Sequence, residues 1–344
     1  MKILIISPSP PDYLGGLSLF TKGLAKNLGE KDIKVNFLCS SLTKEKNTYE
    51  NYSKNVFLIK KKCYGLGDSK NFLKIKNPLF NVLSYLIKYG KNYDLIHVHS
   101  YIYFSTIQAL YYKIFINRKI PFILHLHGGV QTSEFQSSSF KERLLLILKK
   151  YIFDLFIAKI MLNTVNALIS VSKEDLLAIG HVFKVNRKYN NFYIPNVVNT
   201  ATFQKNPKIK RKYFGFIGRL TPIKGIDYFL QLVEKYNKID KNQEFLIIGE
   251  GPHISDVKFA SNNYPITFFK RVPHEEMPNI YNQISIFIQT SRAEGLPTCI
   301  LEALSCEVPV VASKVGGLSE VIRDDVNGYL FESGNIDQAI KQIS

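Results

Sequence analysis

The chain contains 344 residues, which corresponds to about two domains of ordinary size. Hydrophobic residues make up 46% and charged residues 21%, a composition that excludes disorder, collagen and coiled coil as the main architecture. The excess of 45 Lys and Arg over 28 Asp and Glu gives a net charge of +17, which indicates an anionic partner: nucleic acid, acidic lipid or a phosphorylated substrate.

The chain opens on a short apolar run at residues 2–6, which is shorter than the core of a signal peptide and predicts a first β-strand. Further apolar runs, separated by longer helical stretches, predict parallel strands covered on both faces. The remaining predicted strands are 33–39, 94–98, 121–126, 167–171, 213–217, 244–248, 266–269, 285–289 and 308–312. The four cysteines form no C-x-x-C pair, so we expect no zinc or redox motif and a reducing, cytoplasmic compartment.

The strand–helix alternation restarts after a segment rich in Asn, Pro and Lys that runs from residue 195 to 213. We therefore predict two Rossmann-like α/β domains, 1–195 and 196–344, each with a doubly wound parallel sheet and facing one another across a cleft. Ligands of such sheets bind at the carboxyl ends of the strands.

Gly15 and Gly16 follow the first predicted strand and precede a helical pattern. Two interpretations remain open: a plain turn, or a backbone that lets an anion approach the helix N-terminus.

Two basic stretches stand out in the first half. Residues 144–162 read LLLILKKYIFDLFIAKIML, and four charged residues make a membrane-spanning helix improbable. This stretch predicts either a core helix or a basic amphipathic helix, Lys141–Lys159, on an anionic membrane surface. Residues 54–76 predict a loop or surface element.

His97 and His99 lie two residues apart, as do His125 and His127, so each pair shares one strand face. A metal site formed by these four side chains is one hypothesis. We favour the other, in which they end adjacent strands and His127 alone faces the substrate.

The stretch FIGRLTPIKGID places Arg219 and Lys224 on one loop after the strand that ends near Gly218. Two cations at the carboxyl end of a strand suit a diphosphate, although simple surface charge is the alternative in so basic a chain. Downstream, Glu294 is expected in a loop. Glu302 is expected to point inward from the second turn of a helix whose first residue is Pro297, where it could accept two ribose hydroxyls.

In this order, Gly15-Gly16, His127-Gly128, the Arg219/Lys224 loop, Gly249-Glu250-Gly251 and Glu294-x7-Glu302 resemble the retaining glycosyltransferases of family GT4, which have the GT-B fold. The resemblance spans residues 1 to 335 and is densest from 213 to 331. It implies that a nucleotide-sugar donor contacts Gly15, Gly16, Gly218, Arg219, Lys224, Gly249, Gly251, Glu294, Gly295, Leu296, Pro297, Thr298 and Glu302. It assigns catalytic roles to His127, Glu294, Arg219 and Lys224.

The resemblance further implies transfer of a hexose from a nucleoside-diphosphate sugar to a saccharide or lipid-linked acceptor, in polysaccharide or glycan synthesis. The acceptor would bind mainly to the first domain, with no metal or other cofactor and no nucleic acid as a partner. A UDP-sugar is favoured slightly over GDP-mannose. Family members usually continue beyond the helix at Ser344, so we expect closing helices to be absent here.

Two other function classes remain as alternatives. A nucleotide-sugar epimerase on the same architecture would convert the donor without an acceptor. A non-enzymatic binder of anionic membrane or nucleic acid would account for the charge, although we find no nucleic-acid-binding module in the sequence.

Overall fold

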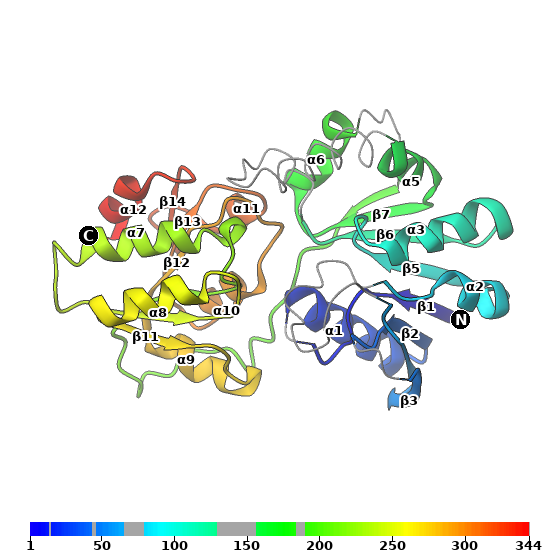
Figure 1. The fold of residues 1–344 in the computed structure, drawn as a ribbon, viewed down its shortest axis with the longest axis horizontal. Coiled ribbons are helices and arrows are strands. Elements are labelled where there is room, and N and C mark those ends of the chain that lie inside the picture. Colours follow the sequence, from blue (N-terminus) through cyan, green and yellow to red (C-terminus); the bar gives the residue numbers. More distant parts are fainter. Residues whose placement is uncertain (14, 43–45, 65–78, 129–155, 184–189, 344) are drawn as a thin grey trace. The chain divides into compact units, whose positions relative to one another are not determined.

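In a computed structural model, the chain divides into two compact units (Figure 1). Unit 1 comprises Met1–Val171 and Asp175–Ile194, and unit 2 comprises Ser172–Glu174 and Pro195–Ser344. The structure describes all residues except 14, 43–45, 65–78, 129–155, 184–189 and 344. Each unit is an α/β structure built on one sheet, and each is described by itself below.

Unit 1 contains an eight-stranded sheet in the order β3-β4-β2-β1-β5-β6-β7-β8. Its strands are β1 (Lys2–Ile6), β2 (Lys34–Ser40), β3 (Thr48–Ser53), β4 (Val56–Lys61), β5 (Leu95–His99), β6 (Phe122–Leu126), β7 (Ala167–Ser170) and β8 (Asn190–Tyr193). Neighbouring strands are parallel except the β3–β4 pair, which is antiparallel.

Helices cover both faces of this sheet because the strands are apolar on both sides. The helices are α1 (Gly16–Glu30), α2 (Leu83–Tyr89), α3 (Phe104–Tyr111), α5 (Lys159–Thr164) and α6 (Lys173–Val182), with short turns η2 (Gly90–Asn92) and η3 (Tyr112–Ile116). Ile3 and Ile5 of β1 belong to the same core as Ala25 of α1, whereas Leu4 and Ile6 belong to the core that includes α2 and α3.

Unit 2 contains a six-stranded, fully parallel sheet in the order β11-β10-β9-β12-β13-β14. Its strands are β9 (Tyr213–Ile217), β10 (Glu244–Ile248), β11 (Ile266–Phe269), β12 (Ile284–Gln289), β13 (Val310–Ser313) and β14 (Gly328–Phe331). Its helices are α7 (Ile226–Tyr236), α8 (Ile254–Asn263), α9 (Met277–Gln283), α10 (Thr298–Ser305), α11 (Leu318–Val321) and α12 (Ile336–Ile343), with turns η6 (Pro222–Lys224) and η7 (His274–Glu276).

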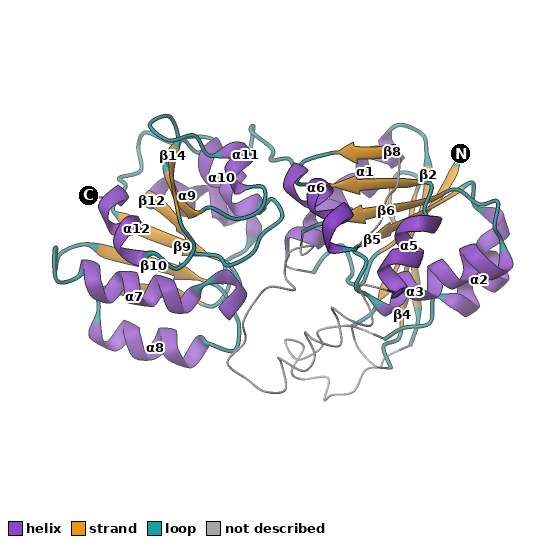
Figure 2. Ribbon diagram, turned by 90° about the horizontal axis from the view of Figure 1, so that it is seen from above, coloured by secondary structure: helices purple, strands orange, loops and turns teal. Residues whose placement is uncertain are grey.

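The helices of unit 2 form two layers around its sheet (Figure 2). Phe214 and Phe216 of β9 pack in a core with α7, α8 and α12. Tyr213 of the same strand packs on the opposite side, in a core with α9, α10 and α11. This two-sided burial is the doubly wound arrangement that the continuous apolar strands predict.

All ten predicted strands are present, with ends that differ by at most two residues. Four strands were missed: β3, β4, β8 and β14. The prediction of a loop or surface element over 54–76 was wrong for β4, where Val56 and Leu58 are buried, and its part from 65 to 76 lies outside the described residues. The lysines that end this strand favoured the prediction of a surface element. A strand next to a sheet edge, however, keeps its cationic side chains in water while its apolar side chains enter the core.

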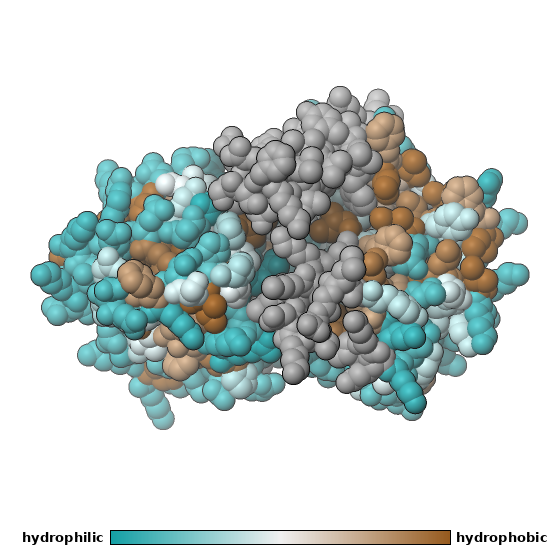
Figure 3. All heavy atoms as spheres, in the orientation of Figure 1, coloured by the Kyte–Doolittle hydropathy of each residue, from teal (hydrophilic) through white to brown (hydrophobic). Residues whose placement is uncertain are grey.

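Among the described residues, no helix combines the length and the apolar composition that crossing a bilayer requires. The predicted membrane-surface helix, Lys141–Lys159, lies outside the described residues except for its final segment, which leads into α5. Exposed apolar side chains on α2, α3 and η3 include Ile87, Tyr111 and Phe115. On the face drawn in Figure 3, hydrophobic colour gathers over one part of unit 1.

Two glycines of α1 should respond oppositely to alanine. A β-carbon at Gly23 would meet nothing within 4 Å, so Gly23→Ala should raise stability by about 1 kcal/mol through helix propensity. A β-carbon at Gly29 would lie 2.2 Å from the Lys54 carbonyl oxygen, so Gly29→Ala should cost about 1–3 kcal/mol. Thermal unfolding of both variants checks the sign, and equal melting temperatures would contradict the packing of α1 on the β3–β4 hairpin.

Candidate active site

Loops at the carboxyl ends of four strands of unit 2 meet at one edge of its sheet. The loop after β9 is bonded to the loop after β10 through Leu220 N–H to the Glu250 carbonyl, at 2.8 Å, and to the loop after β12 through Arg292 N–H to the Ile223 carbonyl, at 2.9 Å. The loop after β13 joins them through Gly317 N–H to the Gly295 carbonyl, at 2.7 Å. These loops hold the predicted donor-binding residues of unit 2 except Thr298 and Glu302, which lie on α10.

The glycines in these loops allow the backbones to approach closely. A β-carbon at Gly249 would lie 1.8 Å from the Gly218 carbonyl oxygen, and one at Gly251 would lie 2.2 Å from the Leu220 carbonyl oxygen. Larger residues would therefore push the two loops apart. Gly249 and Gly251 position the loop that carries Arg219 and Lys224.

Lys224 and Glu294, the cation and the first glutamate of the predicted motif, form an ion pair. The Lys224 ammonium lies 2.6 and 2.7 Å from the two carboxylate oxygens of Glu294. Both side chains are largely shielded, with exposed fractions of 16% for Lys224 and 6% for Glu294. Because the pair is shielded from water, losing either side chain would leave the other as an uncompensated buried charge.

Two further side chains hold the Glu294 carboxylate. Ser291 Oγ donates to its Oε1 at 2.6 Å, and Gln289 Nε2 donates to the same oxygen at 3.0 Å. Neither residue was predicted from the sequence. Their only signal is proximity along the chain, since both lie within five residues of Glu294 where β12 ends.

A second ion pair fixes the start of α7 against the loop after β12. The Arg292 guanidinium donates to both carboxylate oxygens of Asp227, at 2.7 and 2.5 Å, and lies 3.6 Å above the centre of the Tyr228 ring. Burial opposes the charge on Asp227, but the hydrogen bonds and positive charge of Arg292 prevail and hold the pKa of Asp227 below its ordinary value. This clamp holds the loop that carries Lys224.

Glu302 points inward from the second turn of α10, as predicted, and is buried. Tyr281 donates its hydroxyl to Glu302 Oε2 at 2.7 Å, and His274 Nε2 lies 3.2 Å from Oε1. Burial and the negative charge of Glu302 raise the pKa of Tyr281 well above its ordinary value, so the phenol remains a donor. Nothing in the local sequence indicated Tyr281 or His274, which come from α9 and η7.

The remaining predicted residues of unit 2 lie in the same loops or at the start of α10. Arg219 is exposed at the start of its loop, Leu296 is buried, and Thr298 begins α10. Pro297 is the N-cap of α10 and has an extended backbone, so its prediction as the first helical residue was wrong by one position. An extended residue before Thr298 leaves the first backbone N–H groups of α10 without helical acceptors.

Gly15, Gly16 and His127 belong to unit 1. Gly15 is the exposed N-cap of α1 and Gly16 is the first residue of that helix. His127 directly follows β6 and is half-buried. Its Nε2 lies 2.9 Å from Nδ1 of His99, and its ring contacts the edge of Phe20 with centres 4.9 Å apart.

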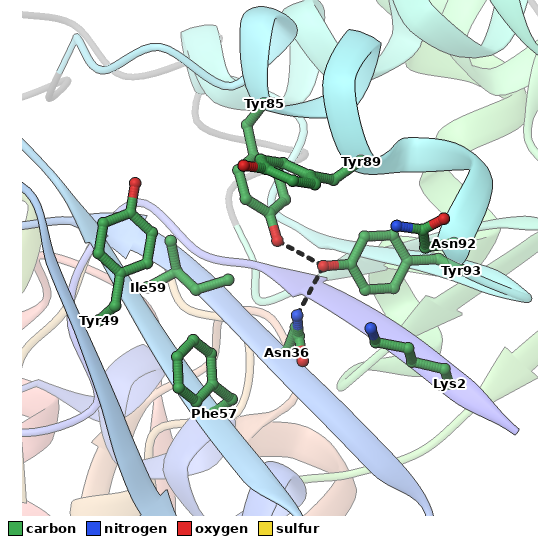
Figure 4. A pocket seen from close by; sticks show the side chains of 9 residues that line it. All are labelled: Lys2, Asn36, Tyr49, Phe57, Ile59, Tyr85, Tyr89, Asn92 and Tyr93. Carbon is green, nitrogen blue, oxygen red and sulfur yellow. Dashed lines mark hydrogen bonds between the residues drawn. The ribbon is translucent and has the colours of Figure 1, made fainter.

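A hollow of about 250 Å³ on unit 1 lies near the amino-terminal ends of the strands (Figure 4). Figure 4 shows the Tyr93 hydroxyl between Tyr85 and Asn36, with hydrogen bonds of 2.5 and 2.7 Å. We do not assign the active site here, because ligands of open α/β sheets bind at the opposite, carboxyl-terminal edge. The innermost polar groups of the hollow also form hydrogen bonds with one another.

Two protein-family models together cover nearly the whole chain. Residues 14–202 match the model described as Glycosyltransferase Family 4, and residues 198–344 match the model described as Glycosyl transferases group 1. An uncharacterised glycosyltransferase of Methanocaldococcus jannaschii is 30% identical over 97% of this chain and 85% of its own length.

A second relative is the UDP-Gal:α-D-GlcNAc-diphosphoundecaprenol α-1,3-galactosyltransferase of Escherichia coli, which is 26% identical over 92% of this chain and 80% of its own length. Among solved structures, sucrose-phosphate synthase of Thermosynechococcus elongatus superposes with a TM-score of 0.77 at 17% identity, covering 99% of this chain and 88% of that one. Anabaena HepE, solved with UDP and glucose, gives 0.69 at 18% identity and the same coverages. The fold is therefore GT-B, and the chain belongs to the glycosyltransferases of family 4.

Proposed function

We propose that this glycosyltransferase moves a hexose from a UDP-sugar to a saccharide or lipid-linked acceptor and retains the anomeric configuration of the sugar. The observation that carries the proposal is the shielded Lys224–Glu294 pair among the carboxyl-end loops of unit 2. Two comparisons support the substrate classes: the E. coli relative is named for UDP-Gal and a diphosphoundecaprenol-linked sugar, and HepE was solved with UDP and glucose.

In this proposal, unit 2 stabilises the leaving nucleoside diphosphate. Breaking the anomeric C–O bond places negative charge on the diphosphate, which Lys224 and the exposed Arg219 neutralise. The N-terminus of α10, at Thr298, adds backbone N–H donors and the positive end of a helix dipole. These groups supply the neutralisation, so we propose that the transfer step is metal-independent.

The carboxylate of Glu294 is held by Lys224, Ser291 and Gln289, which suits binding of the sugar hydroxyls better than nucleophilic attack. We therefore propose that the acceptor attacks from the face that the diphosphate leaves. The leaving phosphate oxygen takes the acceptor proton, which yields retention without a covalent sugar–enzyme intermediate. His127 would contact the transferred sugar from unit 1.

The proposed place of action is the cytoplasm, with peripheral association to an anionic membrane face where lipid-linked acceptors reside. The net charge of +17 and the lipid-linked substrate named for the E. coli relative support this. The predicted membrane-surface helix, Lys141–Lys159, lies almost entirely outside the described residues.

The decisive experiment measures release of nucleoside diphosphate from UDP-galactose, UDP-glucose, UDP-N-acetylglucosamine and GDP-mannose, each with and without undecaprenyl-diphosphate-linked GlcNAc. We expect release of UDP only when the acceptor is present. NMR should show an α-linked product from an α-linked donor. A β-linked product would refute retention. Conversion of the donor sugar without any acceptor would identify an epimerase instead.

Glu302→Gln should raise the donor KM by about 10–100-fold. A hydrogen bond to a charged acceptor contributes about 1.5–3 kcal/mol, and the neutral amide loses part of that binding energy. The amide oxygen can still accept from Tyr281, which preserves the fold. The matched control is Glu307→Gln, at an exposed glutamate paired with Lys205 just after α10. A wild-type donor KM for Glu302→Gln would exclude Glu302 from the donor site.

A further inference from the structure

Three histidines of unit 1 converge under α1. His97 and His99 lie on one face of β5, and His125 lies on β6 opposite His99 in the parallel register. All three are buried, with exposed fractions of 7%, 0% and 1%. We call these three residues the histidine cluster. The ring of Phe20, on α1, packs at a steep angle of 77° to the ring of His125, with centres 4.8 Å apart, and covers the cluster on that side.

The histidine cluster contains buried polar atoms that have no hydrogen-bond partner among the described residues. These are Nε2 of His97, Nε2 of His99, and both ring nitrogens of His125. An unsatisfied buried polar group costs about 1–3 kcal/mol, so several at one place call for a bound species that satisfies them together. Each histidine offers at least one such nitrogen.

We propose that the histidine cluster is a zinc-binding site, with His97 Nε2, His99 Nε2 and one ring nitrogen of His125 as ligands. One nitrogen from each residue lies within 4.8 Å of the other two. Three imidazoles match the preference of Zn²⁺ for nitrogen ligands and leave a fourth coordination position open. The proposal concerns unit 1 alone and departs from our expectation of a metal-free protein. The site adjoins His127, the residue that the proposed function places against the transferred sugar.

Binding requires the imidazole rings to turn. A Zn–N distance of about 2.0–2.1 Å in tetrahedral geometry brings the ligand nitrogens to about 3.3 Å from one another. The rings of His97 and His125 are now nearly parallel, at 7°, with centres 5.5 Å apart, so they must rotate for their lone pairs to converge.

The hydrogen bond between His99 and His127 supports this choice of ligand atoms. His99 uses Nδ1 toward His127 Nε2, at 2.9 Å, and its free nitrogen is the proposed ligand Nε2. Metal-bound histidines commonly donate their second ring N–H to a neighbour, which fixes the orientation of both groups. Zinc on His99 would then set the tautomer of His127, leaving the Nδ1–H of His127 to donate outward.

The test uses the full-length chain without a polyhistidine tag, stripped with a chelator and titrated with ZnCl₂ against a chromophoric zinc indicator. We expect one Zn²⁺ per chain, a higher melting temperature with Zn²⁺ than with EDTA, and no such rise with Mg²⁺, which prefers oxygen ligands. Zinc X-ray absorption should report nitrogen ligands at about 2.0–2.1 Å.

His97→Gln and His125→Gln should each weaken Zn²⁺ binding at least about 10-fold and reduce the rise in melting temperature. Circular dichroism of the metal-free variants verifies that they fold. The matched control is His181→Gln, at an exposed histidine near the end of α6, which should bind Zn²⁺ as the unchanged protein does. The proposal is overturned if the folded wild-type chain binds no Zn²⁺ at micromolar concentration, or if the cluster variants bind it as tightly as the control.

Discussion

Lys224→Ala is expected to lower the rate of acceptor-dependent nucleoside diphosphate release by about 100- to 1000-fold, the usual cost of removing one preorganised donor to a developing negative charge. The ammonium now lies 2.6 Å from Glu294, at the edge where the four carboxyl-end loops of unit 2 meet. Its loss removes the cation that faces the departing diphosphate in the proposed mechanism. Steady-state kinetics with saturating donor measures the effect.

The same substitution leaves Glu294 as a largely buried carboxylate without its cation, so we expect it also to lower the free energy of unfolding by about 3 kcal/mol. The double variant Lys224→Ala/Glu294→Gln removes the unpaired charge and should recover stability but not turnover. Lys241→Ala, at an exposed lysine after α7, is the matched control and should retain full turnover. Full turnover in folded Lys224→Ala would refute the proposed role of Lys224.

Gly225→Ala is expected to destabilise unit 2 strongly. Gly225 has a φ of 66°, in the left-handed region, and its β-carbon would lie 1.8 Å from the Thr290 carbonyl oxygen. The backbone strain of about 1–2 kcal/mol and the overpacking of about 1–3 kcal/mol together predict a loss near 3 kcal/mol. For a unit of this size, that loss lowers the melting temperature by about 6–12 °C.

Activity should fall in parallel, because Gly225 lies between Lys224 and the first residue of α7 and fixes where the ammonium points. A displacement of about 1 Å can cost about 100-fold in rate. Gly218→Ala serves as the structural control, since its β-carbon would meet only Phe216, at 3.8 Å. If Gly225→Ala melted at the same temperature as Gly218→Ala, the close contact between the loops after β9 and β12 would be refuted.

Much of the architecture can be predicted from the sequence because the relevant signals are local. Continuous apolar runs marked all ten predicted strands, of which only β11 lies at a sheet edge among the described residues. Of the missed strands, β3 and β8 are edge strands with a weak local pattern. Thr48–Ser53 is mostly exposed, and Asn190–Tyr193 carries two asparagines at a sheet edge. Strands of this kind are stabilised by pairing with a neighbour, which no local pattern reports.

The sequence by itself determined the family, the two-sided burial of the strands, and the choice of Lys224, Glu294 and Glu302, because motif spacing and apolar periodicity are properties of the chain. Only the tertiary structure decided which side chains meet. Lys224 and Glu294 pair across 70 residues, Tyr281 reaches Glu302 across 21, and two neighbouring strands bring His99 opposite His125. The physical reason is that parallel strands align their carboxyl ends in space while helices separate them in sequence, so contacts at that edge depend on strand order and register.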